Sequence, residues 1–192
     1  MALQSLMVQL GTPAPDFTLP SVDGDTFSLN SFASQPALLV AFLSNHCPYV
    51  RRIEHAFGAV TAELASEGLA TVAIGSNDVR NYPDDDADHL REQARRAGFR
   101  FPYLIDESQE VAKAFRAQCT PDLFLYDADR RLAYRGEFDA ARPGNDLPSD
   151  GASLRSAVSF VFAGGIVPEP HTPSIGCGIK WKPGNEPRMT LG

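Results

Sequence analysis

The stretch from Ser44 to Arg51 places a cysteine where a thiol can react. Cys47 follows an apolar run and is followed at once by Pro48, which suits the first turn of a helix. A helix start offers unpaired N–H groups and the positive end of the helix dipole, and both stabilise a thiolate. The thiolate is the nucleophilic form of cysteine. The stretch therefore predicts either a redox-active thiol or a structural cysteine packed at a helix start.

The side chains close to Cys47 in the sequence allow two interpretations. His46 directly precedes the cysteine, and its imidazolium form would favour the thiolate. Adjacent residues need not face each other, so His46 is equally compatible with a hydrogen bond within the loop. We expect His46 and Pro48 to support the site.

Two further cysteines are candidates for the thiol that resolves a disulfide on Cys47. Cys119 precedes the dipeptide Thr120-Pro121, and Cys177 lies in the last part of the chain. The alternatives are that Cys119 is packed in the core, that Cys177 is packed in the tail, or that an external thiol does the resolving. A disulfide needs two Cα atoms within about 7 Å, which the sequence leaves open.

The elements around Cys47 predict an α/β protein. Residues 37–43 are almost all apolar, as in a central strand that is buried on both faces. Apolar residues after Cys47 recur at spacings of three and four, which predicts a helix with one buried face. The glycine in residues 67–68 predicts its end. Residues 69–74 predict the next strand, so the crossover is parallel and right-handed.

The remaining elements follow from the same patterns. The predicted strands, helices and hairpin are an N-terminal hairpin at about 11–29, a helix to about 98, a strand at 101–105, a helix at 108–116, strands at 122–126 and 131–135, and a last helix ended at 164–165. The chain then becomes rich in proline and glycine. We expect one domain at 1–166 and an irregular tail at 167–192 that packs on it.

Polar residues of other segments are expected near the same edge of the sheet. Asn77 follows the carboxyl end of the second buried strand, where ligand and catalytic loops gather in α/β sheets. Arg135 ends the last strand, and we expect both residues to support the active site. The acidic run at 84–88 fits a solvated helix start better than a metal site.

Composition narrows the classes of function. The chain has 192 residues, a net charge of −7 and three cysteines. The negative charge argues against nucleic acid or an acidic membrane surface as a partner. The cysteines are too few and too widely spaced for a disulfide framework or a zinc site. No stretch reads as a membrane span or a signal peptide, so we expect no metal and a cytoplasmic location.

Longer motifs resemble the peroxiredoxin-like branch of the thioredoxin-fold superfamily, which includes the alkyl hydroperoxide reductase and thiol-specific antioxidant group. They are Ala14-Pro15-Asp16-Phe17 with Asp23-Gly24, Asn45-His46-Cys47-Pro48-Tyr49-Val50, and the tail from Gly176 to Pro187. The resemblance implies a thioredoxin fold, with a central mixed sheet flanked by helices. It also implies that Thr120-Pro121 contains a cis-proline that faces the active thiol.

The motifs also depart from the two standard mechanisms of this superfamily. Thioredoxins use Cys-x-x-Cys, and here the second position is Val50. Typical peroxiredoxins have a proline where this chain has Val40, although Ser44 retains the hydroxyl position. The site therefore predicts a single nucleophilic thiol whose partner comes from elsewhere.

These observations predict a thiol-dependent oxidoreductase in which Cys47 attacks a disulfide. The alternatives are a peroxiredoxin-like thiol peroxidase, which passes through a sulfenic acid, and a non-catalytic thioredoxin-like binding module. No cofactor is expected, because sulfur carries the electrons. The expected partners are a protein disulfide, a small disulfide or a peroxide as substrate, and an external thiol as reductant.

Overall fold

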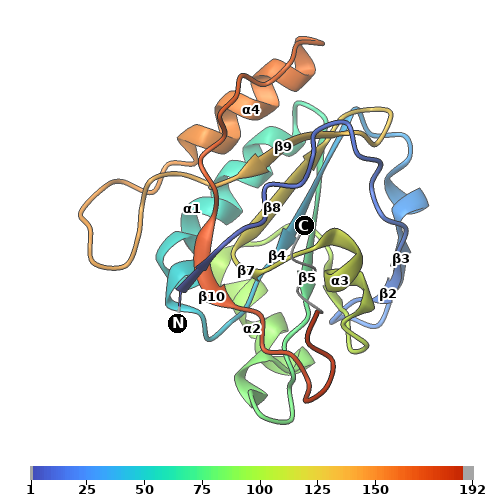
Figure 1. Cartoon of the computed structure of the whole chain (residues 1–192), viewed down its shortest axis with the longest axis vertical. Helices are drawn as coiled ribbons and strands as arrows, with labels where there is room; N and C mark the ends of the chain where they lie inside the picture. Colours follow the sequence, from blue (N-terminus) through green and yellow to red (C-terminus); the bar gives the residue numbers. More distant parts are fainter. Residues whose placement is uncertain (1, 188–192) are drawn as a thin grey trace.

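The computed structural model describes residues 2–187, and a five-stranded mixed sheet forms its centre (Figure 1). Four strands run in one direction and one runs antiparallel to both of its neighbours, which confirms the predicted mixed sheet. In spatial order the strands are β6 (Tyr103–Ile105), β5 (Leu69–Gly75), β4 (Ala37–Phe42), β8 (Asp122–Tyr126) and β9 (Leu132–Gly136).

Strand β4 is buried on both faces, as the apolar run predicts, because each face packs on a separate core cluster. Leu39 and Leu43 belong to the cluster on one face. Leu38 and Phe42 belong to the cluster on the other face. Since side chains alternate along a strand, a single apolar run supplies both clusters. Cys47, four residues after Leu43, joins the first cluster.

Helices and a hairpin cover the two faces of the sheet (Figure 1). One cluster takes apolar side chains from α1 (Pro48–Ala65), α2 (Ala87–Ala97) and α4 (Ala152–Phe162). The other takes them from α3 (Glu110–Phe115), the hairpin β2 (Thr18–Pro20) and β3 (Thr26–Ser28), and the short 3-10 helix η1 (Leu29–Phe32). A second 3-10 helix, η2 (Pro83–Asp85), precedes α2.

The tail contains a strand that the sequence did not predict. Strand β10 (Ile175–Gly178) lies between β1 (Ala2–Gln4) and β7 (Cys119–Thr120). It is antiparallel to both neighbours. Figure 1 shows β10 running alongside the start of α1. Glycine-rich sequence disfavours strands in general, so this one depends on its two neighbours.

Two further observations concern the described residues. Helix α3 begins at Glu110, with Gln109 as its N-cap, slightly later than predicted. Across residues 2–187, no helix combines the length and apolar character needed to cross a bilayer.

Candidate active site

Cys47 lies at the N-cap of α1, directly before Pro48 at the first helical position. Its backbone is extended (φ −73°, ψ 121°), so the helix starts immediately after the thiol. The side chain has no exposed surface. The thiol donates a hydrogen bond to the carbonyl oxygen of Thr120, with 3.0 Å between Sγ and the oxygen. The nucleophile predicted from sequence is therefore a buried thiol at a helix start.

The opposite wall of the site is the segment from Cys119 to Pro121. The peptide bond between Thr120 and Pro121 is cis. Thr120 is buried, and its carbonyl group faces Cys47. This arrangement has the form that the resemblance implies.

Cys177 is the cysteine that the fold brings to Cys47. Strand β10 pairs with β7 so that Cys177 lies directly opposite Thr120, whose carbonyl oxygen already accepts from Cys47. Burial raises the pKa of the Cys177 thiol to about 11, and its hydrogen bond to Cys47 and the charge there act in the same direction. Cys177 is thus packed against the cluster that contains Cys47, and no disulfide joins the two cysteines in this structure.

Cys119 is close by but faces other groups. Its thiol contacts the carbonyl oxygen of Pro121 at 3.5 Å, and in the β7–β10 pair it lies opposite Gly178. Burial raises the pKa of Cys119 far above its ordinary value, and the carboxyl of Asp122 adds to this effect. A thiol held in its neutral form is a poor nucleophile, so Cys119 is the weaker of the two candidate resolving residues.

Asp85 holds the loop that carries the nucleophile, a role that the acidic run did not predict. Its carboxylate accepts from the backbone N–H groups of Asn45 (2.7 Å) and His46 (3.2 Å). It also accepts from the Ser44 hydroxyl, the Asn77 amide and the His46 ring. Asp85 is 4% exposed, so the interpretation of 84–88 as a solvated helix start is wrong at this position.

The charge of Asp85 is maintained despite its burial. Burial alone would raise its pKa, but hydrogen bonds from His46, Asn77 and Ser44 and the charge of His46 together lower the pKa below its ordinary value of 3.8. The carboxylate remains ionised near neutral pH.

Asn77 and His46 link this loop to the tail. The Asn77 side chain donates to Asp85 and accepts from the backbone N–H of Lys180 (2.8 Å). The His46 ring stacks on Tyr82, with ring centroids 5.4 Å apart, and the Lys180 ammonium lies 5.6 Å from the centre of the same Tyr82 ring. Both predicted support residues thus position the loop and the tail around Cys47.

A second buried charge fixes the other side of the loop. Glu54 of α1 is 3% exposed and accepts two hydrogen bonds from Arg96 of α2. The same guanidinium donates to the side-chain oxygen of Asn45 (3.0 Å). Because both partners come from regular helices, the Asn45 side chain is held rigidly beside the nucleophile.

The side chains of Arg135 and Ser44 make contacts with residues other than Cys47. The buried Arg135 guanidinium bonds to the ring of His171 (2.8 Å) and the carboxylate of Glu169 (3.0 Å), both in the tail. The Ser44 hydroxyl donates to Asp85. Among the described contacts, neither side chain reaches Cys47.

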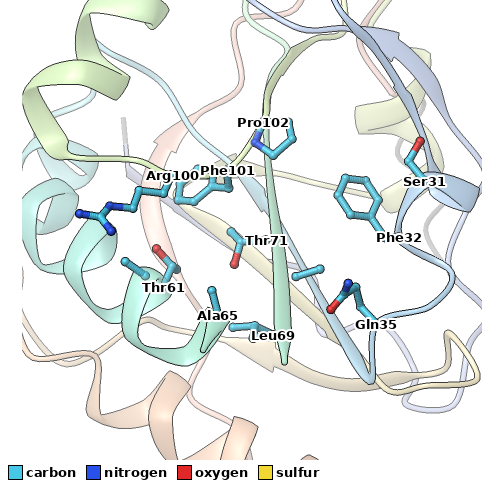
Figure 2. A pocket seen from close by; sticks show the side chains of 12 residues that line it. Ser31, Phe32, Gln35, Thr61, Ala65, Leu69, Thr71, Arg100, Phe101 and Pro102 are labelled. Carbon is cyan, nitrogen blue, oxygen red and sulfur yellow. The ribbon is translucent and has the colours of Figure 1, made fainter. Parts of the chain in front are cut away.

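One hollow beside the sheet is remote from this chemistry. A cavity of about 280 Å³ lies around the first residues of β5, with Thr61, Thr71 and Arg100 in its wall (Figure 2). The parallel register pairs Ala37 with Leu69, whereas Cys47 follows the other end of β4. The cavity therefore lies at the opposite end of the sheet. Within residues 2–187, no group of three metal-binding side chains is found.

Comparison with known proteins identifies the family. The profile of the AhpC/TSA family matches residues 10–135. This chain belongs to the AhpC/TSA family. The match covers the sheet and the Cys47 loop, and it ends before α4 and the tail with Cys177. No curated protein matches the chain.

Two solved structures are similar to this chain over nearly its whole length. A hypothetical protein of Sinorhizobium meliloti 1021 is 50% identical, with a TM-score of 0.92 over 94% of this chain and 99% of that one. An uncharacterised conserved protein of Geobacillus kaustophilus is 43% identical, with a TM-score of 0.92 over 95% and 97%.

A more distant structure confirms the thioredoxin fold. A putative thiol:disulfide interchange protein DsbE of Chlorobium tepidum is 17% identical, with a TM-score of 0.64 over 80% of this chain and 98% of that one. The family and this fold together support a thioredoxin-like redox function and an oxidoreductase at the level of the family.

Proposed function

We propose that this AhpC/TSA protein catalyses thiol–disulfide exchange, with Cys47 as the nucleophile and Cys177 as the thiol that completes its disulfide. One observation carries the proposal: the pairing of β10 with β7 places Cys177 opposite Thr120, whose carbonyl oxygen accepts from the Cys47 thiol. The local dithiol that Val50 removes from the helix is thus supplied by the tail. We call these two residues the Cys47–Cys177 couple.

The exchange transfers two electrons to a disulfide substrate. The Cys47 thiolate attacks one sulfur of the substrate, and the other substrate sulfur leaves as a thiolate. Cys177, after losing its proton, attacks Cys47 Sγ and expels the first substrate sulfur. The products are two substrate thiols and the oxidised couple. An external thiol then restores the reduced couple.

Access to Cys47 requires movement of β10 in the reduced protein. Cys47 has no exposed surface, and β10 packs on α1, at whose start Cys47 lies. A disulfide carried on a polypeptide therefore reaches the nucleophile only when β10 moves aside. In the reduced protein, no covalent bond opposes this movement.

A thiol peroxidase is the second candidate, because a peroxide is small enough to reach a thiol that is closed to larger substrates. Cys47 would become a sulfenic acid with release of an alcohol or water, and Cys177 would condense with it to give the same disulfide and one water. The contacts of Ser44 and Arg135 favour disulfide exchange, since both side chains are engaged elsewhere.

Peptide mapping under non-reducing conditions tests the couple. Oxidised wild type and Cys119→Ser are expected to contain a Cys47–Cys177 disulfide, and Cys177→Ser is expected to lack it. A Cys47–Cys119 bond, or none, would overturn the assignment of Cys177.

Turnover of two oxidants separates the reactions. The reduced protein is mixed with a model protein disulfide and, separately, with hydrogen peroxide. Faster consumption of the disulfide than by free cysteine supports exchange, and faster consumption of peroxide alone supports the peroxidase. If neither oxidant is consumed faster, the chain is a binding module. If Cys47→Ser retains the activity, Cys47 is not the nucleophile.

A further inference from the structure

The cavity at the start of β5 has no part in the proposed function, yet its wall combines apolar side chains with polar groups. Its volume is about 280 Å³, close to the lower end of the usual range for ligand pockets. The apolar part of the wall includes Phe32, Ala65, Leu69 and Phe101. Figure 2 shows Thr71 between the side chains of α1 on one side and Phe32 on the other. The cavity therefore has the size and lining of a site for a small ligand.

Thr71 brings a hydroxyl without a partner to this wall. The residue is 6% exposed, and its Oγ1 makes no hydrogen bond to any described residue. Thr61, another buried hydroxyl of the wall, donates to the carbonyl oxygens of Phe57 and Gly58 in its own helix. A buried polar group without a partner is costly, so native proteins usually pair it with protein, water or a ligand. The Thr71 hydroxyl is thus available to a ligand in the cavity.

The backbone of Thr71 is open on the same edge of the sheet. The N–H of Ala73 donates to Pro102 on the β6 side (3.0 Å), whereas the carbonyl oxygen of Ile74 accepts from Leu43, directly after β4. Since backbone groups alternate along a strand, the N–H and C=O of Thr71 point to the β6 side, as those of Ala73 do. The pairing of β5 with β6 begins only at Ala73. Strand β5 therefore presents an unpaired donor and acceptor at Thr71.

The charge of the wall is positive. Among the described residues that line the cavity, Arg100 alone is charged, and its side chain is exposed at the rim. The chain as a whole carries a net charge of −7, so a positive rim without an acidic neighbour in the wall is a local exception. A guanidinium binds a carboxylate through charge-assisted hydrogen bonds. The cavity is therefore suited to an anion with an apolar body.

We propose that this cavity binds an N-acylated amino acid with an apolar side chain. The ligand N–H donates to the Thr71 carbonyl oxygen, and its carboxylate accepts from the Thr71 N–H and from Arg100, as in a short antiparallel pair at a sheet edge. The acyl oxygen accepts from the Thr71 hydroxyl, and the side chain packs on Phe32 and Leu69. The carboxyl end of a peptide carries the same groups. The site is independent of the Cys47–Cys177 couple, because it lies at the other end of the sheet.

Calorimetric titration of the full chain with N-acetyl-leucine tests the site. Hexanoate lacks the amide, and N-acetyl-leucinamide lacks the charge. We expect saturable binding of N-acetyl-leucine and about tenfold weaker binding of the other two compounds, since each lacks a hydrogen-bonding group. A pentapeptide that ends in leucine distinguishes the two sources of this chemistry. Tighter binding of the peptide assigns the site to peptide ends, and weaker binding assigns it to small acylated amino acids.

Two variants place the binding in this cavity. Thr71→Val and Arg100→Gln are each expected to weaken the binding of N-acetyl-leucine about tenfold. Arg95→Gln is the matched control, because Arg95 is an exposed residue of α2 outside the wall. Thr71→Val keeps the size of the side chain and removes a hydroxyl without a partner. By urea denaturation, this variant is therefore expected to be at least as stable as wild type, so its loss of binding would not reflect a loss of fold.

Several results would overturn the proposal. They are no saturable binding of N-acetyl-leucine, equally tight binding of hexanoate, and binding that neither Thr71→Val nor Arg100→Gln weakens. An equal effect of Arg95→Gln and Arg100→Gln would also overturn it, because it would mean a general attraction of the anion to the protein. If Thr71→Val does not fold, Arg100→Gln at the exposed rim still decides the outcome.

Discussion

Gly176 approaches Thr120 so closely that a Cβ atom on Gly176 would lie 1.9 Å from the Thr120 carbonyl oxygen. That oxygen is the acceptor for the Cys47 thiol. Only a glycine lets β10 lie against β7 at this point. The glycine before Cys177 is therefore a condition for the contact between Cys177 and Cys47.

Gly176→Ala is expected to separate the couple. Since the clash is with backbone, β10 must shift away from Thr120, and Cys177 must move with it. We expect slower formation of the Cys47–Cys177 disulfide and faster alkylation of Cys47 in the reduced protein. Mass spectrometry after timed iodoacetamide treatment measures the alkylation.

Gly165→Ala is the matched control for this substitution. A Cβ at Gly165 would lie 3.4 Å from the nearest atom, the Phe160 carbonyl oxygen, which is an ordinary contact. This variant is expected to match wild type in both assays. Equal behaviour of the two alanine variants would contradict the role assigned to Gly176.

Much of the fold could be predicted from local patterns, but the covering of the site could not. The apolar run at 37–43 and the spacing of α1 predict a buried strand, a helix and a cysteine between them. Strand β10 has no such pattern. Its position depends on its pairing with β1 and β7, which are distant in sequence and are themselves too short to predict.

The role of Asp85 was hidden for a related reason. Acids near a helix start are usually solvated, and Asp84 follows that rule, whereas Asp85 is buried. The groups that donate hydrogen bonds to Asp85 belong to the Cys47 loop, about forty residues earlier in the chain. Which of several neighbouring acids faces inward depends on the geometry of η2, and the sequence does not specify it.

Asp85→Asn is expected to destabilise the protein by about 2–4 kcal/mol, because the loop donors lose a charged acceptor inside the protein. Asp84→Asn is the matched control, since the Asp84 side chain is exposed. Urea denaturation at pH 7 measures both. If the free energy of unfolding falls by the same amount in Asp85→Asn and in Asp84→Asn, the role of Asp85 is contradicted.

The pH dependence of Asp85 supplies a second measurement. The folded-state pKa of Asp85 is lowered, so the unfolded state takes up the proton first as the pH falls. The stabilisation by the carboxylate is present above the ordinary pKa of 3.8 and is lost as the pH falls through the lower folded value. The difference between wild type and Asp85→Asn is expected to shrink in that acidic range.

Asp122 is expected to make the protein less stable as the pH rises, which is the opposite of the effect of Asp85. Its side chain is fully buried, and burial raises its pKa to about 7 despite hydrogen bonds from the N–H groups of Gln118, Cys119 and Leu123. The stabilisation of the protonated form is complete below the ordinary pKa of 3.8. It is lost as the pH rises through about 7, by about 4 kcal/mol in all.

Asp122→Asn removes this titration. The free energy of unfolding of the variant should therefore vary less between pH 5 and pH 8 than that of wild type. Urea denaturation at several pH values measures the two slopes. Parallel curves would show that Asp122 does not titrate in this range.

Removal of residues 1–4 tests whether β10 is the cover of Cys47. These residues include β1, which pairs with β10 through Ala2–Cys177 and Leu3–Gly176. Without β1, the strand is held on one side only, so we expect it to move more often. Cys47 in the reduced protein should be alkylated faster than in the full chain.

The oxidised protein provides the control for this deletion. Once the disulfide ties β10 to α1, the loss of β1 no longer uncovers Cys47. Loss of the disulfide from the truncated chain during short exposure to a bulky thiol then reports attack at Cys177, which has lost its strand partner Ala2. Equal alkylation of the two reduced proteins would mean that β1 does not hold the cover.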